Sequence, residues 1–120
     1  MSKIRKPVME VIQNMAGGPG YVKKTSLIEG NGDLFYAGRL FSHCVLEQDC
    51  GVGYHVHQGD GEIYYILKGE AEYNDNGNIV TLTAGDVTHT APGEGHGITN
   101  RKAEPVEFIG LILFETGKTE

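Results

Sequence analysis

The chain has 120 residues, of which 39% are apolar, so it is long and apolar enough to bury the core of one domain. Sixteen acidic and ten basic side chains give a formal net charge of −6, which argues against nucleic acid or an anionic membrane surface as the main partner. No apolar run reaches the roughly 20 residues of a membrane-spanning helix, and the N-terminus lacks the hydrophobic core of a signal peptide. We therefore expect a cytoplasmic protein.

The first quarter of the chain gives weak structural signals. Residues 1–16 show no dominant hydrophobic period, so a strand and a short helix both fit them. The run Gly-Gly-Pro-Gly at 17–20 ends any element there. Residues 21–28 alternate weakly, as an edge strand does, and 29–33 read as a loop. We interpret residues 1–33 as a lead-in with an edge strand that serves an interface.

A long strand is predicted over residues 34–46, LFYAGRLFSHCVL. A period of two turns Cys44 inward and turns Arg39 and His43 to the other face, away from any pocket. With no secretory context, Cys44 and Cys50 are expected to stay reduced. We interpret Cys44 as a small core residue and not as a catalytic thiol, because no basic neighbour in the sequence would lower its pKa.

The stretch 53–69, GYHVHQGDGEIYYILKG, carries the strongest chemical signal. In a strand His55 and His57 share one face, because successive side chains point to opposite sides. The four residues Gln-Gly-Asp-Gly that follow are turn chemistry, so the chain can double back. Glu62 then starts the returning strand within cross-strand reach of the two imidazoles. Two histidines and a carboxylate on one face indicate a metal site.

The second half of the chain reads as short strands separated by turn signals. Asn76-Gly77 is a strong hairpin signal. The expected strands cover residues 70–73, 79–82, 87–91, 96–100 and 106–114. Roughly eight to ten short strands with no long helical pattern predict an all-β antiparallel sandwich or barrel.

His96 follows a Pro/Gly reversal and lies four residues before Asn100, on the same face of an extended segment. Together with the earlier stretch, this resembles the two sequence motifs of the cupin superfamily. The first motif is matched at His55, His57, Glu62 and Gly69, and the second keeps the spacing of Gly85, His96 and Asn100. The second motif departs at Ala91, which stands where the family has proline, with Pro92 one residue later.

The resemblance implies a cupin-type β-barrel, or jelly roll, over residues 34–116. It also implies one divalent metal ion, held by His55, His57, Glu62 and His96. Three imidazoles and one carboxylate are borderline ligands that suit Mn or Fe, with Co, Ni, Zn and Cu also compatible. The ion together with Glu62 would carry a charge near +1, which favours a small anionic oxygen ligand.

The resemblance leaves two classes of function open. One is a metal-dependent enzyme of the dioxygenase or decarboxylase type acting on a small organic acid, since short members similar to this chain look like oxalate-decarboxylase relatives. The other is a non-catalytic module that binds or senses a small anion at the same metal. An arginine near the metal would favour oxalate, but Arg39 and Arg101 are expected to face away from it.

Four residues near the expected site are further candidates. Glu94 and Asp60 lie in loops beside ligands, and each is either a general acid at the mouth of the barrel or a solvated turn residue. His89 is a third catalytic candidate, with its facing undecided. Tyr64 shares the inward face with Glu62, so it either contacts substrate or fills the barrel as an aromatic core residue.

A homodimer is also expected. The apolar residues of the N-terminal segment and of the face that carries Phe41 and Val45 exceed what a small barrel needs inside. Such surplus apolar faces often mark subunit interfaces.

Overall fold

The computed structural model describes residues 1–116. Within them, the chain forms ten strands and two single-turn 3₁₀ helices. The strands are β1 (Met9–Gln13), β2 (Tyr21–Ser26), β3 (Gly38–Leu46), β4 (Gly51–Val56), β5 (Asp60–Lys68), β6 (Glu70–Asp75), β7 (Asn78–Thr83), β8 (Val87–Thr90), β9 (Gly95–Thr99) and β10 (Val106–Phe114). The helices are η1 (Met15–Gly17) and η2 (Asn31–Leu34), and neither has the length or apolar character to cross a bilayer.

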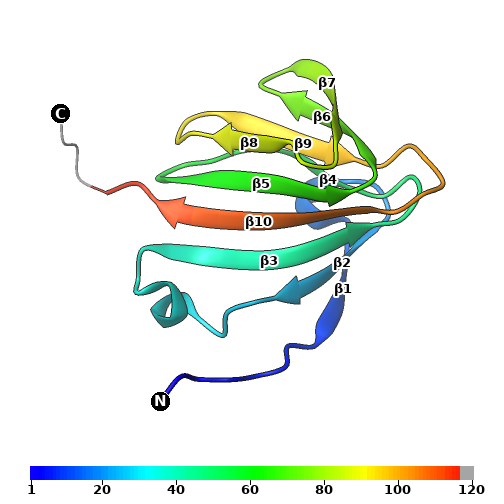
Figure 1. The fold of residues 1–120 in the computed structure, drawn as a ribbon. Coiled ribbons are helices and arrows are strands. Elements are labelled where there is room, and N and C mark those ends of the chain that lie inside the picture. Colours follow the sequence, from blue (N-terminus) through cyan, green and yellow to red (C-terminus); the bar gives the residue numbers. More distant parts are fainter. Residues whose placement is uncertain (117–120) are drawn as a thin grey trace.

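The strands form two antiparallel sheets that pack face to face (Figure 1). One sheet has the order β1-β2-β3-β10-β5-β8 and the other has the order β4-β9-β6-β7. The apolar core lies between them and includes Leu46, Ile66, Ile98 and Phe108, all buried. The predicted all-β jelly roll is therefore confirmed.

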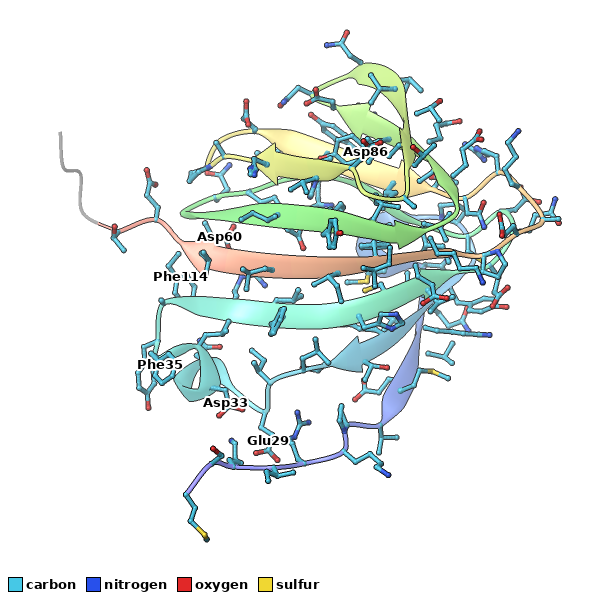
Figure 2. The ribbon with its side chains drawn as sticks, in the orientation of Figure 1. Glu29, Asp33, Phe35, Asp60, Asp86 and Phe114 are labelled. Carbon is cyan, nitrogen blue, oxygen red and sulfur yellow. The ribbon has the colours of Figure 1, made fainter. Side chains whose placement is uncertain are left out.

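The inward residues of the three central strands β3, β10 and β5 lie in layers, because the strands are in antiparallel register. The layers, taken along the sheet, are Cys44–Phe108–Ile66, then Ser42–Gly110–Tyr64, then Leu40–Ile112–Glu62. The first layer belongs to the apolar core, whereas the third brings a carboxylate inside. Asp60 and Phe114 pair just beyond it, where β5 begins and β10 ends (Figure 2). The polar end of the interior is thus at the start of β5.

Two expectations for the N-terminal part are wrong. The strand at Tyr21–Ser26 is not an edge strand, since β2 pairs with β3 on one side and with β1 on the other, and β1 is the edge. The long strand starts at Gly38 instead of residue 34. Phe35 and Tyr36 have φ angles of 56° and 62°, and left-handed residues of this kind cannot continue a strand.

Both cysteines are buried and free in the structure, and the burial of Cys44 agrees with its predicted place in the core. Burial raises the pKa of the Cys44 thiol to about 12. The thiol is therefore protonated at neutral pH and lacks the thiolate that a nucleophile or metal ligand requires. Cys44 is a core residue packed in the first layer.

Gly69 makes the turn by which the chain passes from β5 in one sheet to β6 in the other. Its φ angle is +89°, and a Cβ atom there would lie 2.5 Å from the Pro105 carbonyl oxygen. Gly77 has a similar φ of +97° but nothing within 4 Å of a Cβ atom. It follows Asn76, which also has positive φ, in the predicted hairpin between β6 and β7.

Gly77→Ala should therefore measure the cost of a positive φ angle alone, whereas Gly69→Ala should measure that cost together with a steric clash. Gly77→Ala is expected to lower the free energy of unfolding by about 1 kcal/mol, the cost of a left-handed conformation for alanine. Gly69→Ala is expected to cost a further ~1–3 kcal/mol, because the Pro105 backbone must move. Urea unfolding of the two variants measures the difference, and equal midpoints would show that the Pro105 contact is unimportant.

Candidate metal centre

Four side chains converge at the polar end of the interior. One ligand atom from each of His55, His57, Glu62 and His96 lies within 4.8 Å of the other three. The Glu62 Oε1 atom is 3.1 Å from the Nε2 atoms of both His57 and His96, and 3.8 Å from that of His55. His55 is partly exposed and the other three are buried, so solvent reaches the group from the side of His55.

Strand register explains this convergence. An irregularity in β4 between Val52 and His55 sets His55 directly opposite His96 on β9, as a β-bulge does when it re-aims a side chain. His57 follows two residues later on the same face. Glu62 comes from the other sheet, where it lies beside Ile112 of β10. The group therefore joins the two sheets.

His55 and His57 are held in the tautomer that a metal ligand needs. The Nδ1 atom of His55 lies 2.8 Å from the Gly53 carbonyl oxygen, and that of His57 lies 2.7 Å from Asp60 Oδ1. Carbonyl and carboxylate oxygens only accept hydrogen bonds, so each Nδ1 carries the proton. Each Nε2 then presents a lone pair to the centre of the group.

His96 is supported by two hydroxyl groups. Its Nδ1 atom lies 2.8 Å from the Tyr73 hydroxyl oxygen and 2.9 Å from Thr90 Oγ1, and these two oxygens are 3.0 Å apart. When Nδ1 donates to one hydroxyl, that hydroxyl can donate to the other, and the chain of bonds leaves Nε2 unprotonated. His96 can thus present the third lone pair.

The electrostatics of the group favour a bound cation. Burial raises the pKa of Glu62, but its polar contacts with the three histidines outweigh that effect and hold the pKa well below the ordinary value. Burial lowers the pKa of His96, which favours its neutral form. The hydrogen bond to Glu62 raises the pKa of His57, so a proton there can supply positive charge. A divalent ion would supply positive charge to all four groups at once, and three imidazole nitrogens with one carboxylate are a donor set that fits a divalent ion.

Tyr64 packs directly against this group. Its ring stacks on the His96 imidazole with centroids 4.7 Å apart. Burial raises the pKa of Tyr64 well above the ordinary value, and a hydrogen bond to Glu62 acts in the same direction. The protonated hydroxyl therefore donates to Glu62. Glycine at position 110 leaves room on the other side, since a Cβ there would lie 3.1 Å from Glu62 Oε2.

Asp60 and Arg39 differ from the sequence prediction. Asp60 is not a solvated turn acid but a buried residue, and its Oδ2 atom accepts a hydrogen bond from Arg39 Nε at 2.8 Å. Burial raises the pKa of Asp60, but the bonds to Arg39 and His57 outweigh it and lower the pKa, so the carboxyl is ionised. Arg39 was expected to face away. It is the extra residue where the β3–β10 register shifts, and such a bulge redirects a side chain.

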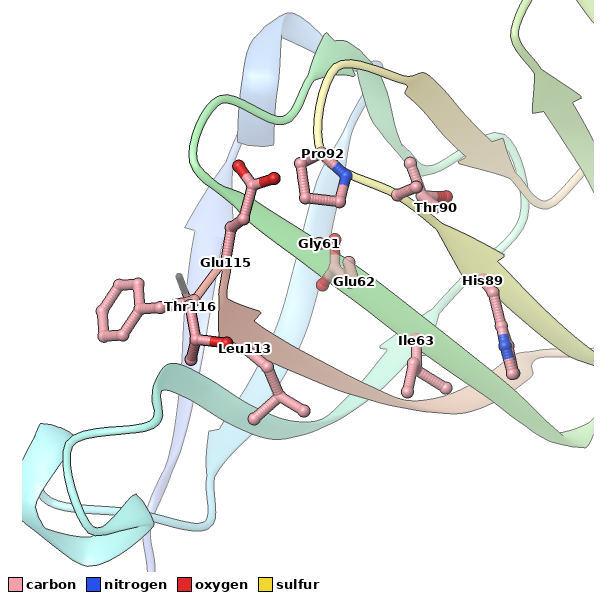
Figure 3. Close-up of a pocket in the computed structure, with 11 residues that line it drawn as sticks. Gly61, Glu62, Ile63, His89, Thr90, Pro92, Leu113, Glu115 and Thr116 are labelled. Carbon is pink, nitrogen blue, oxygen red and sulfur yellow. The ribbon is translucent and has the colours of Figure 1, made fainter. Parts of the chain in front are cut away.

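The structure does not bring Glu94 or His89 to the group. Glu94 is exposed, and its Oε1 accepts a hydrogen bond from the Ala91 N–H in the turn before β9. His89 is exposed on β8, where alternation places it opposite the buried Thr90. With Ile63 it lines an open groove of about 520 Å³ on the outer face of the sheet (Figure 3).

Asn100 and Arg101 have structural positions. Asn100 is fully buried, and its side-chain amide donates to the carbonyl oxygens of Leu46 and Glu104, which closes the loop before β10. Arg101 faces outward as expected and forms an exposed ion pair with Glu72, with Nε and Oε1 3.3 Å apart. Neither residue is one of the four ligands.

Sequence reasoning missed the residues that hold the ligands. Asp60 could have been found, since it follows His57 by three residues in a tight turn and its short side chain reaches back. Tyr73 lies 23 residues from His96 and gave no local signal. Thr90 lies only six residues before His96, but it belongs to the facing sheet and meets His96 only when the two sheets pack. Arg39 was missed because strict alternation takes no account of a bulge.

Comparison with known proteins agrees with this architecture. Residues 42–113 match the family model described as "Cupin domain". The chain is 41% identical to the oxalate-binding protein of Thermotoga maritima over 104 residues, 87% of this chain and 85% of that protein. A crystal structure of a predicted oxalate decarboxylase from Thermotoga maritima superposes with a TM-score of 0.88 at 39% identity, covering 92% of this chain and 95% of that one.

A more distant structure shows the same fold. A Cupin 2 conserved barrel domain protein from Salinispora arenicola superposes with a TM-score of 0.69 at 22% identity, covering 94% of this chain and 89% of that one.

Metal content tests the four-residue group. The purified protein is expected to bind close to one divalent ion per chain, and His57→Ala combined with His96→Ala is expected to abolish binding, because two of three converging lone pairs are lost. The matched control is His43→Ala with His89→Ala, which removes the two histidines outside the group. Elemental analysis after dialysis against metal measures both. Full occupancy in the first double variant would exclude the site.

Proposed function

Because the chain belongs to the cupin domain family, we propose that it binds one divalent transition-metal ion and, through that ion, a small organic dianion of the oxalate type. The ligands are His55, His57, Glu62 and His96. The single observation that carries the proposal is the set of Nδ1 acceptors, which directs three Nε2 lone pairs to one point beside an ionised carboxylate. The donor set favours Mn or Fe, with Co and Ni next and Zn and Cu also compatible.

The charge and lining of the site support a small anion. When bound, the ion supplies positive charge and open coordination positions for oxygen ligands. With Glu62 ionised, the centre keeps a net charge near +1. Leu40 and Ile112 occupy the same layer as Glu62, so apolar walls stand beside the charged group. The oxalate-binding protein of Thermotoga maritima, 41% identical to this chain, supports a dicarboxylate as the ligand.

The arrangement of acids supports binding without turnover. Both Asp60 oxygens are engaged, one by Arg39 and one by His57. Glu94 closes a turn and is exposed. The Tyr64 hydroxyl is committed to Glu62. Among these candidates in the described part of the chain, none is an uncommitted acid next to the four ligands. The enzyme hypothesis, a decarboxylase or dioxygenase, therefore rests on resemblance alone.

Calorimetric titration tests the ligand. Protein loaded with Mn²⁺ is expected to bind oxalate at least roughly tenfold more tightly than acetate, because two carboxylate oxygens can occupy two open positions. Metal-free protein and the His57→Ala, His96→Ala double variant are the controls and should not bind oxalate. At an oxalate concentration of 100 times Kd, stability should rise by about 2.7 kcal/mol. Equal affinity for acetate and oxalate would overturn the dianion assignment.

Turnover is tested separately on the same sample. We expect neither CO₂ release nor oxygen uptake above the level of free metal when Mn- or Fe-loaded protein is incubated with oxalate and related acids. Sustained release or uptake that disappears in the double variant would show that the chain is an enzyme and that the binding module is the wrong choice.

A further inference from the structure

We propose that Arg39 is a positioning residue for the metal centre, which acts through Asp60 to hold the His57 imidazole with Nε2 directed at the other three ligands. The inference rests on the proposed metal binding and adds to it a residue that touches none of the ligands.

The contacts form a continuous chain from the surface to the ligand. Arg39 Nε donates to Asp60 Oδ2 at 2.8 Å, and His57 Nδ1 donates to Asp60 Oδ1 at 2.7 Å. Each carboxylate oxygen therefore serves one neighbour. On the far side of the imidazole, His57 Nε2 lies 3.1 Å from Glu62 Oε1 and 3.2 Å from His96 Nε2. The orientation of this ring depends on where Asp60 is held.

Asp60 needs Arg39 because its side chain is buried. It is 8% exposed, whereas the Arg39 side chain is 46% exposed. A buried carboxylate oxygen that lacks a donor on one side can turn toward water. Such a turn removes the acceptor from His57 Nδ1 and allows the imidazole to rotate or to change tautomer. Arg39 holds the carboxylate in place while its own head remains partly hydrated.

The local backbone is shaped for this contact. Leu40 pairs with Ile112 and Gly38 pairs with Leu113, which leaves Arg39 as the unpaired residue of the strand. Asp60 lies at the start of β5, one strand beyond β10, where it pairs with Phe114. A regular strand would keep Arg39 in the outward alternation, whereas the bulge allows its side chain to reach the end of β5.

Metal affinity separates this role from that of an ordinary ion pair. We would measure Kd by competition with a chromophoric chelator for Arg39→Gln, Asp60→Asn, the combined variant and Arg39→Lys. Asp60→Asn is expected to weaken binding roughly 10- to 100-fold, as loss of an outer carboxylate partner of a ligating histidine does. Arg39→Gln is expected to weaken it several-fold, and Arg39→Lys to restore part of the affinity, since lysine can donate one bond to Asp60.

The combined variant tests whether Arg39 acts through Asp60. It is expected to bind metal no more weakly than Asp60→Asn alone, because the arginine has no other route to the ligand. The matched control is Arg101→Gln, which breaks the exposed pair with Glu72 and should leave Kd unchanged. Additive losses in the combined variant would overturn the proposal, as would wild-type affinity in Arg39→Gln.

The tautomer of His57 distinguishes positioning of the imidazole from a purely structural role of Asp60, because a purely structural role would leave the tautomer unchanged. Long-range ¹H–¹⁵N NMR of metal-free protein at a pH where His57 is neutral is expected to show the Nδ1–H form in wild type and in Arg101→Gln. Asp60→Asn should shift it toward the Nε2–H form, because the introduced amide can donate to Nδ1. An unchanged tautomer in Asp60→Asn would overturn the proposal. Wild-type protein that binds no metal would instead overturn the proposed function itself.

Discussion

The candidate site depends on the hydrogen bonds at the outer nitrogen of each imidazole. Gly53, Asp60, Tyr73 and Thr90 supply them, from β4, the start of β5, β6 and β8. Without these partners, three neutral histidines could rotate or exchange tautomers, and their lone pairs would no longer meet. The barrel therefore contributes the residues that orient the imidazoles as well as the four candidate ligands. It brings several strands into one register, so that each ligand is held from behind by a different part of the fold.

The same arrangement explains why an ionised carboxylate is tolerated inside the barrel. Glu62 is buried, but it lies among three imidazoles and accepts a hydrogen bond from the Tyr64 hydroxyl. A small residue at position 110 leaves space for its second oxygen. Burial alone would make the carboxyl neutral, so its charge is maintained by these neighbours and is available to a cation. Packing and electrostatics thus both favour the ionised form of Glu62.

Much of this architecture could be predicted from the sequence, because turn residues and alternation are local signals. The Asn76-Gly77 hairpin and the inward position of Cys44 follow from two to four residues each, and the family motifs mark the four residues that converge in the structure. Phe35 and Tyr36 adopt left-handed conformations that their residue types do not indicate. The strand predicted from residue 34 therefore begins only at Gly38. The bulge at Arg39 turns its side chain toward Asp60, whereas alternation along a regular strand predicted that it faces away from the site. The partners of His96 come from β6 and from β8 of the facing sheet, so they depend on how the two sheets pack, which no local pattern encodes.

The division of the four groups between two sheets has a mechanical consequence. His55 and His96 belong to β4 and β9, His57 follows β4, and Glu62 belongs to β5 of the facing sheet. An ion at their centre would link the two sheets, and its binding free energy would stabilise the native state alone, because the unfolded chain does not hold the four groups together. The end of the sandwich beside the partly exposed His55 would then open more slowly when the site holds an ion. The opening rate of that end would therefore report on metal occupancy.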